Sequence, residues 1–158
     1  MAKFAEICLT TDFSKNAEAA VPYAVELARR DGGKIWLVHV FDGTYLYEAT
    51  READEAAFPN PAHWIDPIYH RLQTRIQELA TEYTAREGVV FTPVLLNGDP
   101  IDEIVKFIQS HALDCLTIAT HGYRGISHAL YGSVAERLVR TSPCPVLSVR
   151  PPRWTTRL

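Results

Sequence analysis

The chain has 158 residues, 47% of them hydrophobic, which suffices for one domain with a buried core. Its 16 Lys and Arg and 19 Asp and Glu give a formal net charge of −3, without a basic run of the kind that grips nucleic acid. No stretch reaches the roughly 20 apolar residues that span a bilayer, and no apolar leader opens the chain. We therefore expect a cytoplasmic protein that binds neither nucleic acid nor a membrane.

The three cysteines do not form a metal or redox motif. Cys8, Cys115 and Cys144 lack both the C-x-x-C spacing and the ligand spacings of zinc sites. Cys8 and Cys115 fall in apolar runs, where a cysteine behaves as a small hydrophobic residue. We expect no metal site.

Short apolar runs alternate along the chain with segments whose apolar residues recur at helical spacing. The apolar runs predict strands at residues 4–10, 35–41, 89–96, 113–118 and 146–149. Helices are predicted after Ser14, from Asp66, after the cap Asp99, and over residues 134–140. This alternation predicts an α/β fold, a parallel sheet with right-handed crossovers and helices on both faces.

Three prolines refine the assignment. Pro22 lies inside the first helical pattern, so that helix is either kinked there or regular only after it. Asp66 and Pro67 have the features of an N-cap and a first helical residue, which predicts that the second helix starts there and runs to Gly88. Pro93 cannot donate to a ladder, which predicts that the third strand is an edge strand.

Residues 42–66 show no regular spacing and have a composition of their own. Aromatic and acidic residues are interleaved there, and Pro59 and Pro61 interrupt any long element. A loop of this length in a compact domain usually has a function or is mobile. It covers a ligand, touches a second subunit or is a solvated excursion, and we favour the last two.

A glycine-bearing loop leads from the fourth predicted strand into the last helix. Ser133 and Glu136 have the S-x-x-E spacing of a capping box, which predicts that the helix starts at Gly132 or Ser133. The unpaired N–H groups and partial positive charge of a helix N-terminus attract anions, and Gly122 and Gly132 let a bulky anion approach. We interpret the loop as a phosphate cradle. The alternative is that the glycines only permit turns and Ser133 only caps its helix.

Residues 119–134 resemble the signature of the universal stress protein family, which is G-x-x-G, nine residues, then G-[S/T]. Gly122, the nine residues that follow it, and Gly132-Ser133 match the second and third parts of this pattern. Ala119 stands in place of the first glycine. In members that bind ATP this backbone faces the ribose.

The resemblance extends over most of the chain. Residues 133–136 and 143–147 are also similar to the family, and only residues 42–66 and the tail 151–158 fall outside the likeness. It implies a single domain over residues 1–150, with a Rossmann-like fold of the adenine nucleotide alpha hydrolase type. The implied strand order is 3-2-1-4-5, which agrees with an edge position for the third strand.

The resemblance also implies a site for ATP, or for ADP or AMP, with or without Mg²⁺. In the order 3-2-1-4-5 the chain reverses direction across the sheet between the first and fourth strands. Open α/β sheets bind ligands at the carboxyl ends of the strands at such a switch point, so the site would lie where these two strands end. Thr10, Thr11 and Asp12 would line the adenine and ribose, and Val40 would contact the adenine. The remaining implied site residues are Ile118, Ala119, Gly122, Arg124, Gly132, Ser133 and Val134.

Some of these residues have other possible roles. Asp12 caps the first helix together with Ser14 in an alternative that is compatible with binding. Arg124 is either a cation over the phosphates or a solvated loop residue. His121 and His39 have no nucleophile with a matching set of partners, so we assign neither a catalytic role, and His39 fits a strand histidine with a satisfied hydrogen bond.

Three classes of function remain open. The first, which we favour, is a regulatory protein whose shape or association changes with bound ATP. The second is a slow ATPase, although the chain lacks the S-G-G-x-D-S and H-x-G-H motifs of related enzymes. The third is a family dimer that has lost nucleotide binding, which Ala119 favours. The family pairs its last strand with a second copy, so we expect a homodimer through residues 146–149.

Overall fold

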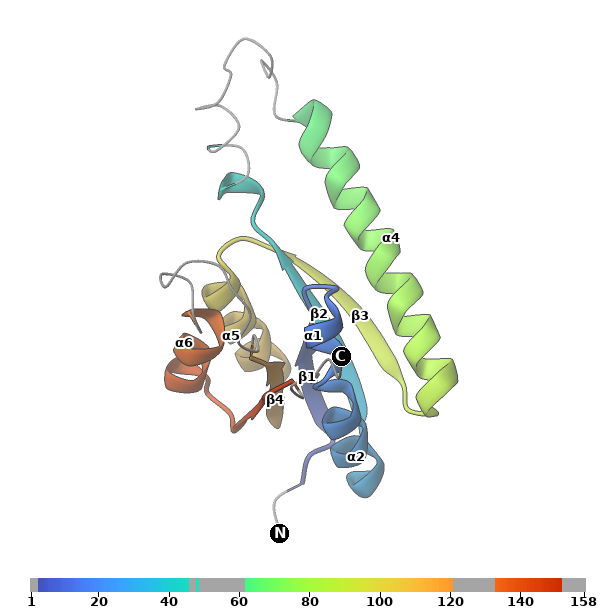
Figure 1. Cartoon of the computed structure of the whole chain (residues 1–158). Coiled ribbons are helices and arrows are strands. Elements are labelled where there is room, and N and C mark those ends of the chain that lie inside the picture. Colours follow the sequence, from blue (N-terminus) through green and yellow to red (C-terminus); the bar gives the residue numbers. More distant parts are fainter. Residues whose placement is uncertain (1–2, 46–47, 49–61, 121–132, 152–158) are drawn as a thin grey trace, which may run out of the picture.

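The computed structural model describes residues 3–45, 48, 62–120 and 133–151, with only the backbone described at 62–65 and 133. The strands in these ranges are β1 Glu6–Thr10, β2 Lys34–Phe41, β3 Phe91–Asn97, β4 Cys115–Ala119 and β5 Val146–Val149. They form one parallel sheet of five strands in the order β3-β2-β1-β4-β5 (Figure 1). The predicted fold class and strand order are confirmed.

Helices cover both faces of this sheet. The helices whose bounds are fully described are α1 Lys15–Glu18, α2 Val21–Asp31, α4 Ala62–Glu87, α5 Pro100–His111 and α6 Ser133–Thr141, and residues 43–45 and 48 are also helical. Helices α2 and α4 pack on one face, and α5 and α6 pack on the other (Figure 1). None of the helices in the described ranges is long and apolar enough to cross a membrane.

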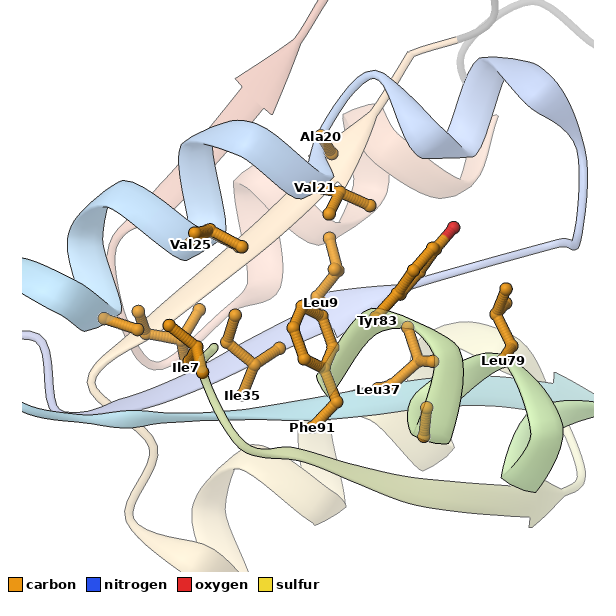
Figure 2. Packing of buried hydrophobic residues seen from close by; sticks show 14 of the residues in the cluster. Ile7, Leu9, Ala20, Val21, Val25, Ile35, Leu37, Leu79, Tyr83 and Phe91 are labelled. Carbon is orange, nitrogen blue, oxygen red and sulfur yellow. The ribbon is translucent and has the colours of Figure 1, made fainter. Parts of the chain in front are cut away.

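Two clusters of buried side chains attach the helices to the sheet. In the first, side chains of α2 and α4 gather over β1, β2 and β3 (Figure 2); they include Val21, Val25, Leu79, Tyr83, Ile7, Leu9, Ile35, Leu37 and Phe91. The second lies on the opposite face and includes Cys8, Val38, Leu116, Ile118, Ile104, Ile108 and Leu138. Alternate residues of one strand therefore enter different cores, which explains why the central strands are apolar throughout.

The first helical region is divided at Pro22. Helix α1 ends at Glu18, and α2 begins at Val21 with Pro22 in its first turn, where a missing N–H costs no helical hydrogen bond. This confirms that the helix becomes regular only at the proline. Gly32 ends α2 in the left-handed conformation, with φ 65°.

The predicted start of the second long helix is wrong. Helix α4 begins at Ala62, so Asp66 is not its cap and Pro67 lies inside it. The predicted irregular segment is accordingly wrong at residues 43–45, 48 and 62–66, which are helical. Pro67 is the sixth residue of α4, so its missing N–H removes one helical bond, to the His63 carbonyl, close to the amino end of the helix.

The remaining boundaries agree with the sequence within two residues. Asp99 caps α5, its Oδ1 accepting from the N–H groups of Ile101 at 2.9 Å and Asp102 at 3.0 Å. Strand β3, with Pro93, is an edge strand as predicted. Cys8 and Cys115 are buried in their strands, also as predicted.

The strand order creates a switch point at the centre of the sheet. Strand β1 lies between β2 and β4, and the chain leaves β1 toward the face of α1 and α2 but leaves β4 toward α6 on the other face. The helices that follow β1 and β4 therefore lie on opposite faces of the sheet, and the two strands end side by side. Such a divergence is where open α/β sheets bind their ligands.

Candidate functional site

Six of the predicted site residues meet at this switch point. Thr10 is the last residue of β1, and Thr11 and Asp12 follow it. Ile118 and Ala119 are the last two residues of β4, and the register of β1 with β4 places them beside the end of β1. Val40 lies in β2, two residues beyond the partner of Thr10.

The loop after β1 is held by hydrogen bonds within itself. The Phe13 N–H donates to Thr11 Oγ1 at 3.0 Å, and the Ser14 N–H donates to Asp12 Oδ1 at 2.9 Å. Ser14 caps α1, as predicted, by accepting from the Ala17 N–H at 3.2 Å. Asp12 thus acts within the capping turn while its side chain remains exposed beyond the carboxyl end of β1. A loop with its polar groups satisfied in this way has little conformational freedom left to lose on binding.

Phe13 has an unusual backbone conformation in this loop. Its φ is 63°, in the left-handed region, which costs a residue with a side chain about 1–2 kcal/mol. The Phe13 ring packs against the ring of His39, with centroids 4.5 Å apart, and against the first core cluster. These contacts compensate for the strain.

His39 of β2 is hydrogen-bonded to the same loop. Its Nδ1 lies 2.8 Å from the Thr11 carbonyl oxygen, and because a carbonyl only accepts, Nδ1 carries the proton. Burial lowers the pKa of His39 below its ordinary value of 6.5, although the bond to Thr11 and the charge of Asp12 oppose the shift. The side chain is therefore a neutral donor that links β2 to the loop, and the predicted satisfied hydrogen bond is confirmed.

Strand pairing between β1 and β2 stops at this point. The register ends with Thr10 opposite Val38, and the last backbone bond runs from the Thr11 N–H to the Val38 carbonyl at 2.9 Å. In a strand the N–H and C=O of one residue point to the same neighbour, and this direction alternates along the chain. The backbone groups of Val40 therefore point to the β1 side, where β1 has already ended. Its side chain packs instead against the second core cluster.

Ala119, which replaces a glycine of the signature, occupies an ordinary strand position. It pairs with Val149 of β5, and its half-buried methyl group packs against the first core cluster. The exit from β4 is tied down directly after it, because the Thr120 N–H donates to the Val149 carbonyl at 2.8 Å. The methyl group thus fills core space.

The rest of the predicted site lies on or beyond the amino end of α6. Gly122, Arg124 and Gly132 lie outside the described residues. Ser133 is the first residue of α6, which agrees with the predicted helix start, and Val134 follows it with 38% of its surface exposed. In the described part of the chain, no three His, Cys, Asp or Glu residues are grouped so that they could hold a metal ion.

A family model described as the Universal stress protein family matches residues 3–150. The chain belongs to this family. Among characterised sequences, it is 27% identical over 150 residues to the universal stress protein YxiE of Bacillus subtilis, covering 93% of this chain and 99% of the relative. It is 31% identical over 153 residues to a putative universal stress protein, SH1215, of Staphylococcus haemolyticus, covering 95% and 87%.

Solved structures of universal stress proteins share the fold. UspA of Lactobacillus plantarum superposes with a TM-score of 0.74 at 19% identity, covering 95% of this chain and 100% of the other. A universal stress protein in complex with cAMP superposes with a TM-score of 0.61 at 20% identity, covering 93% of this chain and 97% of the other. The universal stress protein from Archaeoglobus fulgidus in complex with dAMP superposes with a TM-score of 0.57 at 21% identity, covering 94% of this chain and 98% of the other.

Two features of the candidate site in this universal stress protein were not predicted from the sequence. Phe13 was not considered, because its left-handed conformation depends on the packing of its ring on His39 and leaves no mark in the sequence. The position of the unpaired Val40 backbone was also missed, since only strand register shows where β1 pairing ends. A signal for the first was the histidine two residues before the end of β2, which sequence reasoning treated as structural only.

Proposed function

We propose that this universal stress protein is a regulatory module that binds ATP, or a related adenine nucleotide, in the crevice between the carboxyl ends of β1 and β4. The observation that carries the proposal is the position of the Val40 backbone. Its N–H and C=O point into the space where β1 pairing has ended, beside the preorganised loop of Thr11 and Asp12.

A purine base fits what the crevice offers. The Watson–Crick edge of adenine carries an acceptor, N1, next to a donor, the N6 amino group, and the Val40 backbone supplies a donor and an acceptor side by side. Asp12 is exposed in the loop after β1, and its carboxylate provides an acceptor for ribose hydroxyl groups. The base therefore lies on the β1 and β2 side of the crevice in our proposal.

The phosphates are assigned to the amino end of α6. The glycines of the signature, Gly122 and Gly132, precede Ser133 and the helix, whose N–H groups and partial charge favour an anion. Ala119 is compatible with this arrangement because its methyl group packs toward the core. Relatives of the same fold that were solved with cAMP and with dAMP support an adenine nucleotide as the ligand.

Regulation fits the site better than catalysis. His39 is held by Thr11 and Phe13, and the thiols of Cys8 and Cys115 are buried in the core, where burial raises their pKa. Groups constrained in this way do not serve as a base and a nucleophile. We expect phosphate release from ATP to be no faster with the protein than in buffer with Mg²⁺.

The experiment is to denature freshly purified protein, to identify any released nucleotide by chromatography and mass, and to titrate ATP with Mg²⁺ by calorimetry. Saturable binding that is weakened by Asp12→Ala and abolished by Gly132→Val is the expected result. Asp102→Ala, which makes the same change at an exposed position of α5, serves as the control and leaves binding unchanged. Absence of both bound nucleotide and heat would refute the proposal.

We further propose a homodimer through the outer edge of β5. This strand is the edge of the sheet, Val146 and Leu147 are only half-buried, and the neighbouring α6 exposes 54% of Val139. An apolar edge of this kind is a template for pairing with a second copy. Leu147→Glu should shift the mass measured by light scattering from dimer to monomer, whereas Val90→Glu, at an exposed position away from β5, should not. A monomeric wild-type protein at micromolar concentration would refute the dimer.

A further inference from the structure

We infer that His39 is a positioning residue that keeps the Val40 N–H free for the base, by taking up the backbone carbonyl that would otherwise bind this N–H. The inference rests on the proposed nucleotide site and names the side chain that creates its base-binding edge. His39 itself does not touch the nucleotide in this arrangement.

The argument starts from the bond pattern of a parallel ladder. A residue of one strand donates its N–H to one residue of its neighbour and accepts, with its C=O, from the residue two positions further along. Thr11 makes the first of these bonds, donating to the Val38 carbonyl at 2.9 Å. The second would run from the Val40 N–H to the Thr11 carbonyl.

This second bond is replaced in the structure. The register of β1 and β2 stops at Thr10 and Val38, and no bond joins Val40 to Thr11, both of which are described. The Thr11 carbonyl instead accepts from His39 Nδ1 at 2.8 Å. One side chain thus competes with one backbone N–H for the same acceptor, and the side chain prevails.

The surroundings of His39 favour this outcome. His39 enters the face of α1 and α2, where the Phe13 ring packs on it at 4.5 Å and holds the imidazole under the loop. Two residues after Thr11, Phe13 has a left-handed backbone with φ 63°, and its N–H donates to Thr11 Oγ1 rather than to β2. Both features keep the Thr11 carbonyl directed to the imidazole rather than along the ladder.

Removal of the imidazole therefore has a specific consequence. In His39→Leu the Thr11 carbonyl loses its donor, and the Val40 N–H is the backbone donor that the parallel ladder pattern assigns to this carbonyl. The ladder then extends by one bond, and the nucleotide loses its donor. His39→Asn is the matched control, because the Asn amide nitrogen occupies nearly the position of His Nδ1 and donates to the same carbonyl.

Amide hydrogen exchange tests this step without any ligand. In the wild-type protein the Val40 amide should exchange at least tenfold faster than the Val38 amide, and saturating ATP with Mg²⁺ should slow it. In His39→Leu the Val40 amide should become protected in the absence of ATP, while His39→Asn should behave as the wild type. A Val40 amide that is already protected in the nucleotide-free wild type overturns the inference, and this readout does not depend on the variants folding.

Calorimetry with ATP and Mg²⁺ tests the consequence. We expect the dissociation constant to rise about tenfold in His39→Leu, the equivalent of one neutral hydrogen bond, and to stay within about twofold in His39→Asn. If His39 only stabilised the fold, His39→Leu would lower the midpoint of unfolding, but its dissociation constant for ATP would stay close to that of the wild type. Equal affinities of wild type and His39→Leu overturn the inference alone, whereas a wild type that does not bind ATP overturns the proposed function and the inference together.

Discussion

The left-handed conformation of Phe13 predicts an unusual order of stability between two variants. Phe13 has φ 63°, and its half-buried ring packs on His39 and the first core cluster. Phe13→Ala and Phe13→Gly both remove this ring, so they lose the same packing. They differ in that alanine retains the strain of a Cβ at positive φ, while glycine adopts this conformation freely.

The expected magnitudes follow from these terms. Loss of a half-buried aromatic ring and of its ring contact costs about 2 kcal/mol, and this is the whole effect in Phe13→Ala. In Phe13→Gly, relief of about 1–2 kcal/mol of strain is partly offset by about 0.5–1 kcal/mol of additional chain entropy in the unfolded state. Phe13→Gly should therefore be more stable than Phe13→Ala by about 0.5–1 kcal/mol.

The assay is urea denaturation followed by circular dichroism, with the free energy of unfolding compared between the two variants. Glu78→Ala and Glu78→Gly provide the matched control, because Glu78 is exposed in the middle of α4, where glycine should be less stable than alanine by about 1 kcal/mol. The order should thus be opposite at the two positions. If alanine is the more stable variant at both, the argument from backbone strain at Phe13 is refuted.

Three further perturbations test other parts of the structure. Asp99→Ala should cost about 1 kcal/mol of unfolding free energy in the same assay, because it removes the acceptor for two N–H groups at the start of α5, and Asp99→Asn should cost much less. Gly33→Ala should destabilise by about 1–3 kcal/mol, since its Cβ would lie 2.3 Å from the Ala5 carbonyl oxygen. Because the pKa of His39 is lowered in the folded protein, the unfolded chain takes up this proton first as the pH falls below about 6.5, and stability declines toward acid pH. The loss of stability between pH 7 and pH 5, measured as the change in urea midpoint, should therefore be smaller in His39→Leu.

The sheet could be predicted from the sequence because its rules are local. Pro93 marks an edge in any parallel sheet, and Asp99 followed by Pro100 marks a helix start, and both agree with the structure. The start of α4 shows the limit of the same rules. Asp66 and Pro67 satisfy the pattern of a cap and a first helical residue, yet the helix extends five residues further toward the amino end, over residues 62–66. A local pattern does not show whether the preceding turn also becomes helical.

The candidate site was predictable in outline and not in its details. The ends of β1 and β4 could be placed together because strand order decides which loops meet. The competition between His39 and Val40 for one carbonyl could not be predicted, because it depends on the exact residue at which β1 and β2 stop pairing. Val40 was chosen for its apolar side chain, but this side chain packs against the second core cluster, and its backbone lies beyond the last pair of β1 and β2.

The length of α4 has a consequence for how the molecule opens. Its 26 residues span about 39 Å, whereas the seven residues of β3, against which it packs, span about 23 Å. Where the structure describes the side chains of α4, the buried ones, Ile76, Leu79, Ala80 and Tyr83, lie in the second half, and Figure 1 shows the first turns of α4 extending past the sheet. The amino half can therefore melt in a partial unfolding event that uncovers Phe41, which contacts Tyr69, but leaves the buried residues of the carboxyl half in place. One continuous helix thus joins a segment of marginal local stability to a segment that is packed into the first core cluster.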